Sequence, residues 1–97
     1  MMALLPANKD LISKGVKEFS VLLNQQVFED PLVSEDDMER VVNDWMNIYI
    51  NYYSKHVVGE PQEQDTALKE LQQELKSLSS PFLDNYKTFL KSREHPN

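Results

Sequence analysis

The feature that most constrains this chain is a long apolar stripe with helical spacing in its C-terminal third. Between Leu68 and Phe89, large apolar residues recur in steps of three and four positions, which places them on one side of an α-helix. The stripe consists of Leu68, Leu71, Leu75, Leu78, Phe82, Tyr86 and Phe89. Pro61 suits the first turn of such a helix, because an N–H at that position would be unpaired in any case. The pattern predicts a helix over about 61–91.

Pro81 lies inside this predicted helix. A proline removes one backbone hydrogen bond, here the bond to the carbonyl of Ser77, and its ring crowds the preceding turn. We therefore expect one helix that is kinked at Pro81. A break into two helices is the alternative.

A second stripe predicts a helix near the N-terminus, over about 5–27. Its members are Ile12, Val16, Phe19 and Leu23. This helix must end before Pro31, because a proline disfavours the α conformation at the preceding residue, Asp30.

The middle of the chain predicts a third helix, over about 35–58. Ser34 can cap its start by accepting a hydrogen bond from the N–H of Asp37, and the Asp37 carboxylate can reach back in a variant of the capping box. Gly59 can end it at the C′ position.

These predictions place the chain in the all-α class as a single domain over 1–97. The chain has only two glycines, which disfavours a turn-rich β fold. Because the connecting loops are short, consecutive helices should be antiparallel. We predict an up-down-up antiparallel three-helix bundle.

The predicted middle helix has more apolar surface than one small bundle needs. One apolar line consists of Met38, Val42, Tyr49, Tyr53 and Val57. A second line beside it consists of Val41, Trp45, Ile48 and Tyr52. The two lines together are wider than the usual core-facing stripe, so the second line predicts a protein-binding surface. Alternatively, the broad face simply belongs to the central helix of a small core.

Charge and composition exclude several function classes. The net charge of −6, with lysines spread among acids, disfavours nucleic acid and anionic membranes as partners. The chain has no cysteine, no signal peptide and no apolar run that could span a membrane, so we expect a cytoplasmic protein. His56 and His95 are the only histidines, and neither has a second ligand at helical spacing. We therefore expect no metal, no cofactor and no enzymatic activity.

Three segments of the chain resemble the alpha-haemoglobin-stabilizing protein family. They are Val21–Glu35 (VLLNQQVFEDPLVSE), Asp44–Tyr53 (DWMNIYINYY) and Gly59–Glu63 (GEPQE). The similarity extends over nearly the whole chain, and such long strings are far more specific than a short motif.

The resemblance implies an erythroid chaperone with a three-helix fold that binds free α-globin as a heterodimer. Such a chaperone prevents the globin from precipitating and limits haem-driven oxidative damage until β-globin takes over. The family's loop proline, matched by Pro31, is implicated in oxidation of the bound haem. We therefore expect Pro31→Ala to keep globin binding but to change the rate of haem oxidation.

The resemblance also indicates which residues contact the globin. Those carried over by position are Asp44, Ile48 and Tyr52, with Gln26, Asp30 and Pro31 beside them. Val41 and Trp45 join them as members of the second apolar line. Ile48 departs from the family pattern, in which an aromatic residue is expected.

Two other functions compete with the chaperone hypothesis. A self-associating structural bundle would pair the second apolar line with its own copy, whereas the chaperone should be a monomer when free. Lipid binding by the same surface is a weaker alternative, because acids and not lysines flank it.

Overall fold

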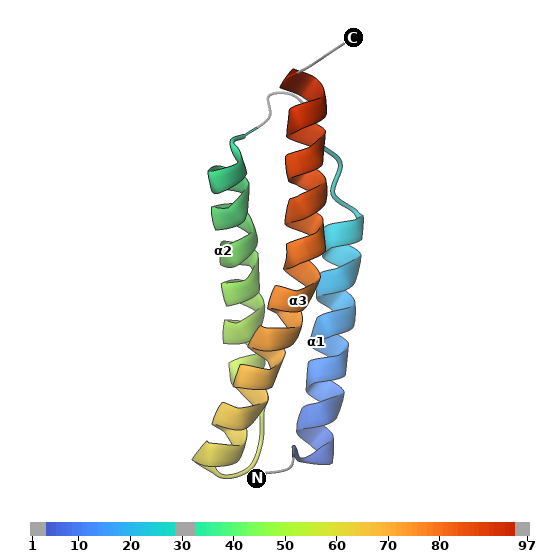
Figure 1. Ribbon diagram of the computed structural model, residues 1–97. Coiled ribbons are helices and arrows are strands. Elements are labelled where there is room, and N and C mark those ends of the chain that lie inside the picture. The colour runs from blue at the N-terminus through green and yellow to red at the C-terminus, as the bar shows by residue number, and fades with distance from the viewer. Residues whose placement is uncertain (1–3, 29–32, 95–97) are drawn as a thin grey trace.

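The computed structural model describes residues 4–28 and 33–94, and its helices are α1 (Pro6–Asn24), α2 (Glu35–Ser54) and α3 (Pro61–Glu94). In Figure 1, α1 runs upward, α2 runs downward and α3 runs upward again in front of both. The predicted all-α, up-down-up antiparallel bundle is confirmed. Both α1 and α2 pack chiefly against α3 and contact each other much less.

Apolar residues of all three helices form the core. Its buried members are Ile12, Phe19, Leu23, Val42, Met46, Tyr53, Ala67, Leu71, Leu75, Phe82 and Tyr86. Met46 stands outside both apolar lines of α2, yet it is buried, and its sulfur lies 3.5 Å from the Ser79 hydroxyl, which also has the Leu75 carbonyl as an acceptor at 2.8 Å. Gly15 is also buried: an added Cβ there would lie 3.0 Å from Cε2 of Tyr53, so the Tyr53 ring would have to shift by a few tenths of an ångström to admit a larger residue.

The first helix ends at Asn24 and not near residue 27 as predicted. The Gln26 side chain donates to the Leu22 carbonyl at 2.9 Å, which satisfies one of the last carbonyls of α1. After this turn the Phe28 ring packs edge-on against Phe82 and Tyr86 of α3, with centroids 5.6 and 4.8 Å away. The early end therefore lets Phe28 close one end of the core.

The second helix starts as predicted but ends at Ser54 and not near residue 58. The Ser34 hydroxyl accepts from the Asp37 N–H at 3.1 Å, whereas the Asp37 carboxylate pairs with Arg40. Beyond Ser54, the N–H and carbonyl of Val58 both bond the buried side chain of Asn8, each at 2.9 Å.

Gly59 is consequently part of the loop before α3 and not the C′ residue of α2. Its φ of +101° is a conformation that L side chains rarely adopt. At the start of α3, the Glu63 carboxylate accepts from the Glu60 N–H at 3.0 Å. The sharp turn therefore belongs to the entry into α3.

The third helix is continuous through Pro81 from Pro61 to Glu94, so the alternative of a break into two helices is wrong. In Figure 1 its yellow part leans across the bundle and its red part runs along the bundle, so the helix is bent. Pro81 is exposed, which keeps its ring away from the core.

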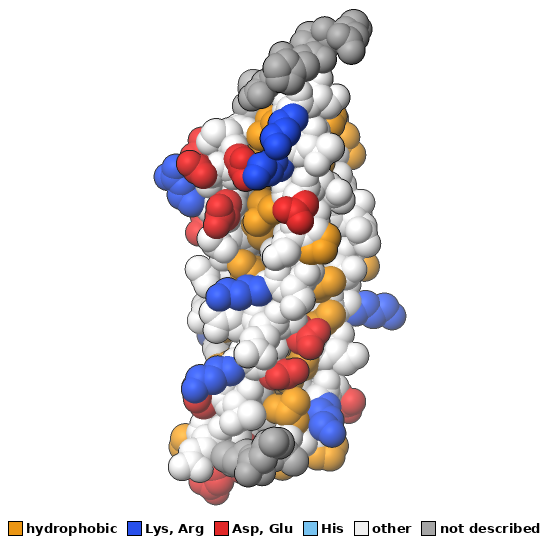
Figure 2. All heavy atoms as spheres, in the orientation of Figure 1, with side chains coloured by type: hydrophobic (Ala, Val, Ile, Leu, Met, Phe, Trp, Pro, Cys, Tyr) orange, Lys and Arg blue, Asp and Glu red, His pale blue; other side chains and the backbone are white. Residues whose placement is uncertain are grey.

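The remaining surface is mixed in character. Figure 2 shows acidic and basic side chains interspersed on the face where α3 lies in front, with apolar strips between the helices. Within residues 4–28 and 33–94, no helix has the length and apolar character that a bilayer span requires.

A candidate protein-binding surface between the first and second helices

The predicted second apolar line of α2 is largely exposed. Ile48 is 62% exposed and Tyr52 is 54% exposed, and these two are one helical turn apart on the same side of α2. Val41 lies further along this side and is 36% exposed. Asp44 is exposed between Val41 and Ile48. Large exposed apolar side chains in one group are a feature of interaction sites.

Two adjoining hollows flank these residues where α1 and α2 face each other. One, of about 200 Å³, is lined by Glu18, Ile48, Tyr49, Tyr52 and Tyr53. The other, of about 400 Å³, is lined by Lys17, Glu18, Val21, Leu22, Gln25 and Tyr49. No residue of α3 lines either hollow. We call the residues of both hollows together the α1–α2 face.

Tyr53 and Tyr49 hold the floor of this face in place. The Tyr53 hydroxyl donates to the Glu18 carboxylate at 3.0 Å, and the Tyr53 side chain is only 2% exposed. Phe19 and Tyr49 meet edge-on with centroids 5.3 Å apart. These contacts fix the positions of α1 and α2 beside the exposed pair.

The same environment keeps both tyrosines protonated. Burial, the hydrogen bond to Glu18 and the Glu18 charge raise the pKa of Tyr53 to about 12. Burial and the Glu18 charge also raise the pKa of Tyr49. Because an ordinary tyrosine is already neutral at physiological pH, these shifts have an effect only in alkaline solution.

This shift predicts a specific loss of stability in alkaline solution. The pKa of Tyr53 is about 12 when folded and 10.0 in its ordinary state, so its contribution is complete below pH 10.0 and is lost as the pH rises through about 12. Tyr53→Phe should reduce the decrease in unfolding free energy over this range, measured by urea unfolding at a series of pH values. Glu18→Gln should reduce it in part, because burial remains. An unchanged pH dependence in Tyr53→Phe would contradict the prediction.

The other predicted contact residues lie in different surroundings. Trp45 is half-buried and packs toward α3, with its ring 6.5 Å from that of Phe82. Asp30 and Pro31 lie outside the described residues. Gln26 is half-buried and does not line the α1–α2 face; the neighbouring Gln25 does.

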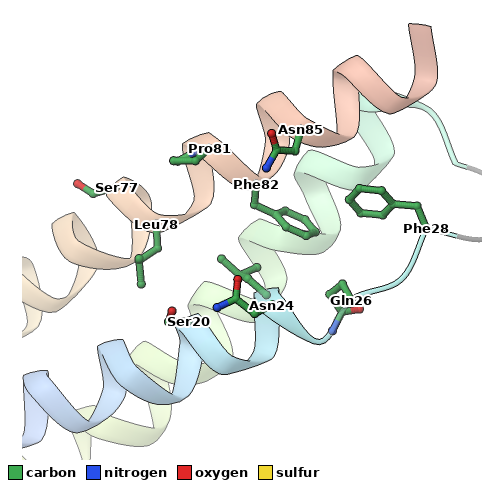
Figure 3. A pocket seen from close by; sticks show the side chains of 10 residues that line it. Ser20, Asn24, Gln26, Phe28, Ser77, Leu78, Pro81, Phe82 and Asn85 are labelled. Atoms are coloured by element: carbon green, nitrogen blue, oxygen red, sulfur yellow. The ribbon is translucent and has the colours of Figure 1, made fainter. Parts of the chain in front are cut away.

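Gln26 instead borders a third hollow, of about 410 Å³, between the end of α1 and the middle of α3 (Figure 3). Its ten lining residues are Ser20, Leu23, Asn24, Gln26, Phe28, Ser77, Leu78, Pro81, Phe82 and Asn85. None of them carries an ionisable side chain, so this hollow offers no group for acid–base chemistry.

Glu18 was not among the predicted contact residues, although its position in the sequence pattern is informative. Leu11, Glu18 and Leu22 are spaced by seven and four positions, which places them along one line of α1 next to the core stripe. An acid on such a line lies at the edge of a helix–helix contact. Within the described part of the chain, no three His, Asp or Glu side chains gather as a metal site would require.

Comparison with known proteins identifies a family that matches this sequence. The family "Alpha-haemoglobin stabilising protein" matches residues 6–92. The alpha-hemoglobin-stabilizing protein of Homo sapiens is 71% identical over 96 residues, covering 99% of this chain and 94% of the relative. That of Mus musculus is 62% identical over 96 residues, with the same coverage. That of Bos taurus is 64% identical over 91 residues, covering 94% of this chain and 99% of the relative. The chain belongs to the alpha-haemoglobin stabilising protein family.

Proposed function

We propose that this chain is a chaperone that binds free α-haemoglobin through the α1–α2 face and stabilises it until β-globin takes over. The observation that carries the proposal is the exposure of Ile48 and Tyr52 on the α1–α2 face, whose floor is held by Tyr49 and by the buried Tyr53. The names of the human, mouse and cattle relatives indicate α-haemoglobin as the partner. The chain would act by binding and not by catalysis.

The chemistry of the face suits such a partner. An isolated globin chain exposes the apolar surface that its partner subunit would cover, and Ile48 and Tyr52 can cover part of it. Glu18 and Asp44 supply negative charge at the rim, which favours a neutral or basic contact surface. Val41, Trp45 and Gln26 remain proposed contacts at the edges of the surface.

The direct test mixes the chain with free α-haemoglobin and follows turbidity over time. We expect the chain to suppress precipitation and to elute with α-haemoglobin as a heterodimer in gel filtration. Added β-globin should displace it, since a holding chaperone must release its client. Turbidity that the chain leaves unchanged would contradict the proposal.

A self-associating bundle is the second candidate, because the exposed pair could also contact its own copy. The net charge of −6 disfavours it, because two copies of the chain repel each other as they approach. Sedimentation of the free chain should therefore give a monomer of 11.3 kDa. A dimer that α-haemoglobin does not dissociate would favour self-association.

The proposed function extends to the redox state of the bound haem. This part rests on the family resemblance of the loop that contains Asp30 and Pro31. Pro31→Ala should leave the affinity for α-haemoglobin within about twofold, because an alanine keeps the neighbouring contacts. It should change the rate at which the bound haem oxidises, followed by visible absorption spectra. Identical spectra and rates in both proteins would contradict this prediction.

The proposed setting is the cytoplasm of red-cell precursors, where free α-globin is made. Immunostaining of such cells, with α-globin as the reference signal, tests this localisation.

A further inference from the structure

The exposed Tyr52 ring contacts two other rings at the end of α2, and these two rings also lie near each other, with centroids 6.5 Å apart. It meets the buried Tyr53 ring edge-on, with centroids 5.1 Å apart and an interplanar angle of 88°. It also lies against the His56 ring, with centroids 4.7 Å apart and an interplanar angle of 35°. We call Tyr52, Tyr53 and His56 the ring cluster.

Both neighbours of Tyr52 are themselves fixed. The Tyr53 hydroxyl is bonded to Glu18 of α1. The Nδ1 atom of His56 lies 3.0 Å from the Tyr52 carbonyl, and a carbonyl can only accept, so Nδ1 carries the proton. This bond holds the imidazole over the last turn of α2, where it also satisfies an end carbonyl.

We propose that His56 is a positioning residue of the binding surface, which holds the Tyr52 ring in its binding orientation before the partner arrives. The inference rests on the proposed function and deepens it. A half-exposed tyrosine that is free to rotate must lose that freedom on binding, and a ring already fixed by its neighbours loses less. The exposed edge of the His56 ring extends the surface beyond Tyr52 with a polar atom, Nε2.

A purely structural role for His56 would be helix capping. The capping role and the positioning role predict different effects of substitutions at this position. Capping needs a hydrogen-bonding group near the Tyr52 carbonyl, whereas positioning needs a flat ring against Tyr52. His56→Gln keeps the first property and His56→Phe keeps the second. His56→Ala removes both.

The test measures the dissociation constant for α-haemoglobin by titration calorimetry in the full chain. His56→Ala and His56→Gln should each weaken binding by about three- to tenfold, whereas His56→Phe should stay within about twofold of the unmodified chain. In a Tyr52→Leu background, His56→Ala should cause no further weakening. Thermal unfolding of each variant checks that the bundle remains folded.

Two results would overturn the role of His56. One is unchanged binding by His56→Ala in a chain that otherwise binds α-haemoglobin. The other is an equal loss from His56→Ala with Tyr52 present and in the Tyr52→Leu background, because the effect would then be independent of the tyrosine ring. An unmodified chain that fails to bind α-haemoglobin at all would instead overturn the proposed function.

Discussion

Replacing Ile48 by aspartate should weaken the binding of free α-haemoglobin by about thirtyfold or more, the loss that is typical of a residue at the centre of an interface. Ile48 is 62% exposed, so the free bundle loses little packing. In a complex, the new carboxylate would be buried against apolar globin surface without a partner, and such burial is costly. The dissociation constant can be measured by biolayer interferometry with immobilised α-haemoglobin.

Gln72→Asp is the matched control for this prediction. It introduces the same charge change at an exposed position of α3, outside the α1–α2 face. It should bind α-haemoglobin as the unmodified chain does, apart from a small effect of the added charge on the association rate. Circular dichroism should show that both variants stay folded. If Ile48→Asp and Gln72→Asp bound equally well, the α1–α2 face would not be the contact surface.

The unequal packing of the three helices explains why a small bundle has such an exposed face. Because α1 and α2 both pack chiefly against α3, α3 supplies most of the core contacts. The sides of α1 and α2 that face each other are then only partly filled, by Phe19, Tyr49 and Tyr53. The exposed Ile48 and Tyr52 lie beside Tyr49 and Tyr53 and line one hollow together with them.

Periodicity predicted the helices and their packing because each helix carries its apolar stripe in its own sequence. The stripe of α3, for example, places Leu71, Leu75 and Phe82 in the core as expected. The two apolar lines of α2 together are wider than a core-facing stripe. This width correctly predicted that the core leaves Ile48 and Tyr52 exposed.

The helix ends could not be predicted in this way, because contacts distant in sequence determine them. The second helix ends early where Asn8, fifty positions away, bonds the backbone of Val58. The first ends early where Phe28 turns toward rings of α3. The Glu18–Tyr53 bond likewise joins residues 35 positions apart, so no local pattern indicated it.

Replacing Asn8 by alanine should lower the free energy of unfolding by about 2–3 kcal/mol, a large loss for one side chain of a small bundle. Asn8 is fully buried, and its amide bonds both the N–H and the carbonyl of Val58 at 2.9 Å. The variant leaves both backbone groups without these partners in a partly buried loop. Urea unfolding followed by circular dichroism measures the change.

Asn43→Ala separates this effect from a general effect of losing an asparagine. Asn43 is exposed in the middle of α2, where alanine is the better helix former, so this variant should be as stable as the unmodified chain or slightly more stable. Asn8→Asp should be no more stable than Asn8→Ala, because a carboxylate cannot donate to the Val58 carbonyl and would lie against it. If Asn8→Ala unfolded at the same urea concentration as Asn43→Ala, the loop before α3 would be held by its own turn at Gly59 and not by the side chain from α1.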